Sequence, residues 1–113
     1  MSWTLRVSKL ARQDIEQTLK WTRLNFGDHQ HNQYAALIRL ALNEIGENPL
    51  NLRSRSRTDL HPDARLFHIG RRGRSARHFF VYRVTQHEQI DIGRFLHDSM
   101  DIKSHLPQGY KTE

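Results

Sequence analysis

The chain has 113 residues, of which 27% are charged, and its formal net charge is +6 at pH 7. This length predicts a single domain with one modest core, which we assign to residues 1–106, followed by a flexible C-terminal tail at residues 107–113. Cysteine is absent, which excludes disulfides and thiolate metal sites. No apolar run is long enough to span a membrane and no signal-peptide pattern precedes the first predicted strand, so we expect a cytoplasmic protein that makes no membrane contact.

The N-terminal half predicts a strand followed by two antiparallel helices. Residues 3–7 alternate apolar and polar side chains, as a strand does. Ser8 can cap a first helix, because its hydroxyl can accept a hydrogen bond from a backbone N–H that has no partner within the helix. Gly27 should end this helix and Asp28 should cap a second one, which Pro49 ends.

Each predicted helix carries apolar side chains at helical spacing, and these two stripes should face the core. In the first helix the stripe consists of Ala11, Ile15, Leu19, Thr22 and Phe26. In the second helix it consists of Tyr34, Ile38, Ala41, Leu42 and Ile45. Two such helices joined by a short turn form a helical hairpin.

The C-terminal half predicts a loop followed by three strands. Residues 50–63 are polar, rich in Arg and Ser and without periodicity, which indicates a loop. Strands are predicted at residues 65–69, 77–84 and 89–97, because these segments are rich in β-branched and aromatic side chains. Residues 101–106 should form one short helical turn. The expected fold class is therefore α+β, with an N-terminal strand, a two-helix hairpin and a three-stranded antiparallel meander.

The positive charge is concentrated in the second half of the chain. Between residues 53 and 83, nine arginines face only two acidic residues, so this segment has a net charge of nine minus two, or +7. Arginine binds phosphate and carboxylate groups through a planar fork of N–H donors, so the segment predicts an anionic partner, either nucleic acid or an acidic protein segment. The alternative is a solvated basic face with no partner. The candidate anion-binding residues are Arg65, Arg71, Arg72, Arg74, Arg77, Arg83 and Arg94.

The eight histidines are candidates for acid–base chemistry rather than for metal binding. Their spacing contains no HExxH pattern, so we expect no metal site and no cofactor. His68 and His97 fall on neighbouring or near-neighbouring predicted strands and could converge with Arg65 and Arg83. Such a cluster could cleave RNA by attack of a 2′-hydroxyl on the adjacent phosphate, which needs an acid, a base and cations but no metal. The alternative is that each histidine packs at the sheet edge and hydrogen-bonds to the backbone.

Two strand segments resemble those of a known family. Residues 77–84 read Arg-His-Phe-Phe-Val-Tyr-Arg-Val, and residues 92–97 read Ile-Gly-Arg-Phe-Leu-His, after which Met100 and Asp101 follow. Together with the order of the predicted elements and the break between the helices, these segments resemble the ParE branch of the RelE/ParE toxin superfamily. The resemblance covers residues 3–106.

The resemblance implies the toxin of a type II toxin–antitoxin pair, with a helical hairpin packed on one face of a small antiparallel sheet. ParE-like toxins are associated with inhibiting DNA gyrase, which blocks replication, and are neutralised by a cognate antitoxin, which we expect to be acidic and ParD-like. On this interpretation the chain is not itself an enzyme.

RelE-like toxins instead cut messenger RNA in the ribosome with basic and acid–base residues on the sheet face, and Arg65, Arg83 and His97 fall near such positions. A ribosome-dependent, metal-independent endoribonuclease is therefore the first alternative, and a non-toxic basic nucleic-acid-binding module is the second.

A second apolar patch on the first helix is the candidate antitoxin site. At about 100° per residue, Trp21 lies about 120° and Leu24 about 180° from the centre of the predicted core stripe, so both should face water, with Leu10 near Trp21. An antitoxin segment docked on these three residues would bury them and bring its acidic side chains to the arginines. The alternative is that the C-terminal tail or the loop at residues 50–63 covers the patch.

Overall fold

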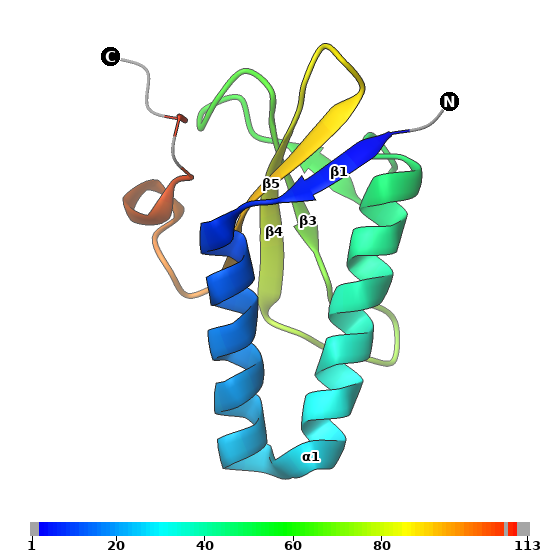
Figure 1. The fold of residues 1–113 in the computed structure, drawn as a ribbon, viewed down its shortest axis with the longest axis vertical. Helices are drawn as coiled ribbons and strands as arrows, with labels where there is room; N and C mark the ends of the chain where they lie inside the picture. Colours follow the sequence, from blue (N-terminus) through cyan, green and yellow to red (C-terminus); the bar gives the residue numbers. More distant parts are fainter. Residues whose placement is uncertain (1–2, 108, 111–113) are drawn as a thin grey trace.

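A five-stranded sheet forms the centre of the fold in the computed structural model, which describes residues 3–107 and 109–110. The elements are β1 (Thr4–Val7), α1 (Lys9–Glu47), β2 (Ser54–Ser56), β3 (Ala64–His68), β4 (His78–Val84), β5 (Gln89–His97) and the 3-10 helix η1 (Ile102–His105). The strand order is β1-β5-β4-β3-β2. Helix α1 covers one face of the sheet, and the C-terminal residues pack against the other (Figure 1). None of the described helices has the length and apolar character that crossing a membrane requires.

A sharp reversal at Gly27 divides α1 into two helical arms. Ser8 caps its start, as predicted, because the Ser8 hydroxyl accepts a hydrogen bond from the Ala11 N–H at 3.0 Å. Gly27 has φ 90° and ψ 179°, a non-helical conformation that glycine adopts without strain. We expected two separate helices here. Because Gly27 is non-helical, α1 consists of two helical arms, a first arm (residues 9–26) and a second arm (residues 28–47), which lie side by side (Figure 1).

The predicted apolar stripes face the sheet along most of α1. The buried members are Ala11, Thr22, Ile38, Ala41 and Ile45, and the partly buried members are Ile15, Leu19, Tyr34 and Leu42. Phe26 is the exception: it is 62% exposed, so its assignment to the core was wrong. The two arms extend beyond the end of the sheet (Figure 1), so no strand covers Phe26 at their tip. Its ring packs edge-on against Trp21 instead, with the ring centroids 5.5 Å apart.

The sheet has one strand more than the sequence predicted. β4 pairs antiparallel with β3 and β5, β1 pairs parallel with β5, and β2 pairs antiparallel with β3. Strand β2 lies within residues 50–63, where we expected a loop throughout. Its sequence, Ser-Arg-Ser, has no apolar periodicity, and the strand exists because its backbone N–H and C=O groups pair with those of β3. The expectation of a loop was therefore wrong at these three positions.

The pleat of the strands gives the sheet two cores. The strand residues under α1 include Phe67, Phe80, Tyr82, Ile92 and Phe95. Those on the far face include Leu66, Phe79, Val81 and Leu96. Gly93 is an extra residue in β5, because Arg94 pairs with Val81 while Ile92 pairs with the next residue, Tyr82. This bulge keeps Ile92 and Phe95 on the same face, although regular alternation would place them on opposite faces.

The C-terminal segment packs on the far face of the sheet. Pro107 and Tyr110 are both buried, and a Cβ atom added to Gly93 would lie 2.3 Å from the Cγ atom of Pro107. We call residues 101–107 and 109–110 the C-terminal strap. The prediction of a flexible tail was wrong for Pro107 and Tyr110, because their rings cover the sheet. The other predicted tail positions 108 and 111–113 lie outside the described residues.

Candidate functional site

Arg94, a candidate anion-binding residue, forms a largely buried ion pair. Its Nε and Nη2 atoms donate to the two carboxylate oxygens of Asp14 at 2.7 and 2.9 Å, and the side chains of Arg94 and Asp14 are only 15% and 14% exposed. Asp14 also accepts a hydrogen bond from the Phe95 N–H at 3.0 Å, and Arg94 Nη1 donates to the carbonyl of His105 at 3.2 Å. These contacts connect β5 to the first arm of α1 and to the strap. Arg94 therefore stabilises the fold.

Arg71 and Arg53 hold the arginine-rich segment against the second arm of α1. Both guanidinium groups hydrogen-bond to the Glu44 carboxylate, Arg53 at 2.9 Å. Burial opposes ionisation of Glu44, but the hydrogen bonds and charges of the two arginines outweigh it and lower the pKa of this carboxyl below its usual value. The Arg53 guanidinium also lies over the Phe67 ring, 4.7 Å from its centroid. Arg71 is therefore part of the attachment between the sheet and α1.

Arg65 belongs to a hydrogen-bond network at the junction of β2 and β3. Its Nε donates to the Ser54 hydroxyl at 2.7 Å, and its Nη2 donates to the Ser54 carbonyl at 3.3 Å. The Ser54 hydroxyl also hydrogen-bonds to the Tyr82 hydroxyl, which donates to the Pro49 carbonyl at 2.6 Å. Burial raises the pKa of Tyr82, so this phenol remains a donor at neutral pH. The network holds β2 in the sheet.

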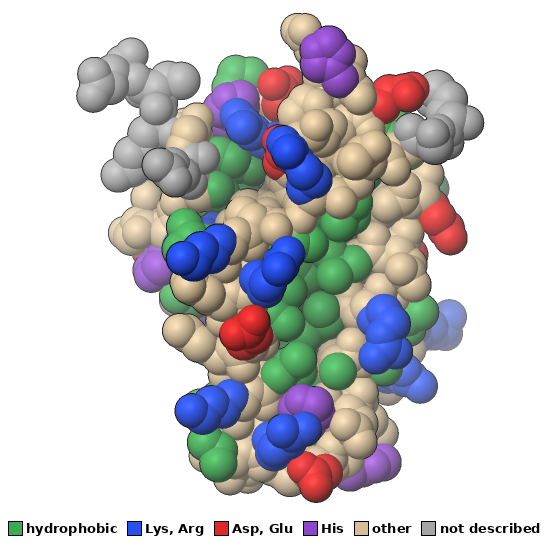
Figure 2. All heavy atoms as spheres, in the orientation of Figure 1, with side chains coloured by type: hydrophobic (Ala, Val, Ile, Leu, Met, Phe, Trp, Pro, Cys, Tyr) green, Lys and Arg blue, Asp and Glu red, His purple; other side chains and the backbone are tan. Residues whose placement is uncertain are grey.

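The accessible candidate arginines lie at the turn between β3 and β4 and at the start of β4. Arg72 and Arg74 are exposed and form no ion pair with any residue that the structure describes. Arg77 is also exposed and pairs with Asp98 at 3.0 Å. Figure 2 shows that Lys and Arg side chains are spread singly over one face of the molecule, around a strip of apolar side chains between the two arms of α1. A continuous basic patch does not form on this face.

The four candidate ribonuclease residues do not converge. Arg65 and His97 lie on the face of the sheet that α1 covers, whereas His68 and Arg83 lie on the far face. Arg83 pairs with Asp91, six residues before His97 on β5, so Arg83 and His97 are on the order of 20 Å apart along the strand. The prediction of one cluster was wrong, because the pleat and the strand pairing separate these side chains. In the described part of the chain, no three His, Asp or Glu side chains are arranged to hold a metal ion.

A cluster around His78, which the sequence analysis did not single out, lies where the sheet meets the second arm of α1. The Tyr34 hydroxyl lies 2.5 Å from His78 Nδ1. The His78 ring stacks on Phe95 at 4.9 Å and meets the His97 ring edge-on at 5.0 Å. Burial, and next the charge of His97, lower the pKa of His78 to about 4, so its imidazole is neutral at pH 7. The alternation of side chains along β4 was the signal that could have placed His78 on the helix side.

Acidification is expected to destabilise the fold through His78. The pKa of this imidazole is about 4 in the folded state and 6.5 in its ordinary state. Between these values the unfolded chain binds a proton at His78 that the folded chain does not bind, so stability falls as the pH falls through this window. The variant His78→Gln should lose this part of the pH dependence, measured as the urea midpoint across the window. His68→Gln, at an exposed position, should retain it. Equal pH dependence in the His78 variant and wild type would contradict the assignment.

A groove lies beside this cluster, between the first arm of α1 and the start of β4. Its volume is ≈ 910 Å³, and its lining includes Trp21, Phe26, Tyr34, Arg77, His78 and His97.

Trp21 is 58% exposed and Leu24 is 75% exposed, as predicted. Leu10 lines a separate hollow at the start of α1, eleven residues and therefore about 16 Å along the helix from Trp21. Leu10 was thus wrongly assigned to the same patch, because a shared helix face does not bring residues close together.

The fold is shared by toxin–antitoxin proteins of known structure. The chain is similar to a solved structure described as the chromosomal ParDE TA system from P. aeruginosa, with a TM-score of 0.68 and 14% identity, covering 85% of this chain and 96% of that chain. It is also similar to a chain in the crystal structure of the toxin–antitoxin complex RelBE2 from Mycobacterium tuberculosis, with a TM-score of 0.57 and 21% identity, covering 86% of this chain and 99% of that chain. At these identities the similarity establishes a common α+β fold. No curated protein sequence matches the chain significantly.

The sequence match identifies the family. Residues 5–102 match the family described as the ParE toxin of the type II toxin–antitoxin system parDE. The matched residues extend from β1 to the start of η1 and include the whole of α1. The chain therefore belongs to the ParE toxin family, and it is the toxin component of a type II toxin–antitoxin system. This confirms the resemblance that the two strand segments indicated.

Proposed function

We propose that this toxin stops growth by inhibiting DNA gyrase and so blocking replication, and that it acts in the cytoplasm as a binding protein rather than as an enzyme. The match of residues 5–102 to the ParE family carries this proposal, since ParE-like toxins are associated with gyrase. The distribution of the four candidate ribonuclease residues over two faces of the sheet supports it. The exposed Arg72 and Arg74 supply guanidinium groups for an anionic surface of the target.

The target is tested with purified toxin, gyrase and relaxed plasmid DNA. We expect the toxin to suppress supercoiling and to leave cleaved plasmid, while messenger RNA from cells that express the toxin stays intact. The double variant Arg72→Ala with Arg74→Ala should reduce gyrase inhibition at least about tenfold, because each guanidinium group lost removes charge-assisted hydrogen bonds. The matched control, Arg12→Ala with Arg39→Ala, removes the same charge from exposed positions on α1 and should inhibit like wild type. Unimpaired supercoiling at saturating wild-type toxin would refute the proposal.

A ribosome-dependent endoribonuclease is the second candidate, because the chain is similar in fold to a chain in the crystal structure of the toxin–antitoxin complex RelBE2. On this alternative, His97 is the acid–base group, since its side chain is 34% exposed and lines the groove beside α1. Site-specific cuts in ribosome-bound messenger RNA that disappear in His97→Ala would favour this candidate. We expect no such cuts from the wild-type toxin.

We propose further that the antitoxin is acidic and ParD-like and docks at the tip of the first arm of α1. Trp21, Leu24 and Phe26 are all more than half exposed there, and the rings of Trp21 and Phe26 are in edge contact. Large exposed aromatic side chains are the residues on which protein interfaces most depend. Lys20 and Arg23 are exposed on the same arm, which fits a partner with acidic side chains.

The double variant Trp21→Ala with Leu24→Ser is expected to weaken antitoxin binding by at least about 2 kcal/mol, the effect of removing an interface hot spot. Its toxicity without antitoxin should be unchanged, since both side chains are exposed and neither supports the core. The measurements are the dissociation constant of the purified pair and growth rescue by the antitoxin. Leu52→Ser, at an exposed leucine before β2, is the control and should bind normally. Neutralisation of the double variant as tight as that of wild type would place the antitoxin elsewhere.

A further inference from the structure

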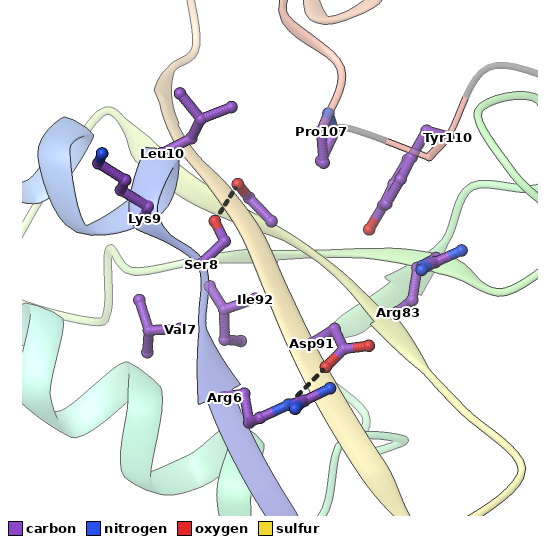
Figure 3. A pocket seen from close by; sticks show the side chains of 11 residues that line it. Arg6, Val7, Ser8, Lys9, Leu10, Arg83, Asp91, Ile92, Pro107 and Tyr110 are labelled. Carbon is purple, nitrogen blue, oxygen red and sulfur yellow. Dashed lines mark hydrogen bonds and ion pairs between the residues drawn. The ribbon is translucent and has the colours of Figure 1, made fainter.

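A second hollow lies between the start of α1 and the C-terminal strap, away from the groove described above. Its volume is ≈ 390 Å³, and β1, β5 and Arg83 of β4 complete its wall (Figure 3). Pro107 packs on Gly93 at its border, which holds the strap at a fixed distance from the sheet. The hollow is therefore built by segments from both ends of the chain.

Two donor groups at this hollow are buried without an acceptor. The Tyr110 hydroxyl and the Arg83 Nε have no hydrogen-bond partner among the described residues, and Tyr110 is only 3% exposed. The Arg83 guanidinium lies 5.1 Å from the centroid of the Tyr110 ring, which orders both groups. Figure 3 shows the Tyr110 hydroxyl pointing from the strap into the hollow, on the side of Arg83. Buried polar groups are almost always hydrogen-bonded, so two unpaired donors at one hollow indicate a ligand with acceptor atoms.

The start of α1 adds further donors. The first N–H groups of a helix have no acceptor within the helix, and the Ser8 hydroxyl satisfies only that of Ala11. The N–H groups of Lys9 and Leu10, two residues that line the hollow, have no hydrogen-bond acceptor among the described residues. The positive end of the helix dipole therefore faces the same space as the two buried donors.

The charges around the hollow favour an anion. Among the described residues, Asp91 is the one acidic residue of its lining, and it is engaged by Arg6 at 3.6 Å and by the Gln89 amide at 2.8 Å. Arg83 has no acidic partner within ion-pair distance among the described residues. Burial raises the pKa of the Tyr110 hydroxyl, so this group stays protonated and can only donate to an anion.

We propose that this hollow is a binding site for a phosphate group, carried either by a free nucleotide or by a DNA backbone. The donors belong to three separate parts of the fold that line the hollow: the start of α1, Arg83 of β4 and Tyr110 of the strap. A tetrahedral phosphate has three or more acceptor oxygens and can meet all three, whereas a planar carboxylate suits a single guanidinium fork. The site is distinct from the groove between the first arm of α1 and the start of β4. The proposal does not depend on which enzyme the toxin inhibits.

The test compares binding of inorganic phosphate, ATP and a short DNA duplex by titration calorimetry at constant ionic strength, because screening alters the non-specific attraction of any basic protein. Wild type should bind at least one of these probes saturably at one site. Tyr110→Phe should bind that probe about tenfold more weakly, because one hydrogen bond to a charged group is lost. Binding of ATP without DNA identifies a free nucleotide as the source, and binding of DNA without ATP identifies the backbone.

Two matched variants separate this site from general charge attraction. Tyr34→Phe removes a hydroxyl that already has His78 as its partner, and Arg39→Ala removes an exposed cation on the second arm of α1. Both should bind the probes like wild type, whereas Arg83→Ala should weaken binding at least as much as Tyr110→Phe. Tyr110→Phe should unfold at the same urea concentration as wild type or a higher one, since the hydroxyl that it removes has no partner among the described residues. Absence of saturable binding in wild type, or equal binding by wild type and Tyr110→Phe, would overturn the proposal.

Discussion

Replacing Asp14 with alanine is expected to destabilise the fold by about 3 kcal/mol, because it leaves a mostly buried cation without its counter-charge. Both oxygens of Asp14 are engaged by Arg94, and one also accepts the Phe95 N–H. The variant therefore leaves the guanidinium and the amide at β5 without their acceptor. It also releases the contact that fastens the first arm of α1 to the sheet. The measurement is the free energy of unfolding in urea.

The matched control for this prediction is Asp28→Ala. Asp28 pairs with Arg23 at 3.1 Å at the tip of α1, but the two side chains are 82% and 56% exposed. Exposed ion pairs contribute at most about 1 kcal/mol, so this variant should remain close to wild type. Similar unfolding free energies for the Asp14 and Asp28 variants would show that the Arg94 pair does not hold the arm.

Replacing Gly93 with alanine is expected to destabilise the protein by about 1–3 kcal/mol through overpacking. The added Cβ would lie 2.3 and 2.6 Å from the Cγ and Cβ atoms of Pro107, closer than any non-bonded carbon contact allows. Because Pro107 belongs to the C-terminal strap, the strap must move away from β5. We expect the variant to unfold at a lower urea concentration than wild type. We also expect a protease to cleave its C-terminal strap faster.

Gly46→Ala is the control for the Gly93 variant. A Cβ atom at Gly46 would lie 3.7 Å from Leu5 Cδ1, which is an ordinary van der Waals contact. Gly46 lies inside α1, where alanine is more favourable than glycine by roughly 0.5–1 kcal/mol, so this variant should be slightly more stable than wild type. A Gly93→Ala protein as stable as wild type, with an uncleaved strap, would show that Pro107 does not rest on the bulge.

Local sequence patterns predicted the parts of the fold that depend on residues near one another in the chain. The alternation and the aromatic content of β4 and β5 predicted both strands, because a half-buried pleated surface requires those side chains. Ser8 and Gly27 marked the start of α1 and its reversal, since a cap and a positive φ are local requirements. The same strand segments were enough to indicate the ParE family.

Only the tertiary structure determines which arginine side chains remain accessible to a binding partner. In the sequence, Arg65, Arg71, Arg72, Arg74 and Arg94 look alike. Only the fold brings Asp14 to Arg94 across 80 residues and Glu44 to Arg71 across 27. An ion pair of this kind depends on two distant segments meeting in one geometry, which no periodicity encodes.

The pleat of the strands and the pairing at the sheet edge determine where the other candidate residues lie. The faces on which His68, Arg83 and His97 lie depend on strand register and on the bulge at Gly93, so their placement on three consecutive strands did not predict convergence. Strand β2 exists because the edge of β3 pairs with it, and not because of its own side chains. The hollow under the strap required β1, β4, β5 and Tyr110 to meet. The sequence by itself thus determined four of the five strands, the cap, the reversal and the family, whereas burial and long-range pairing decided the fifth strand and which polar groups remain free to bind.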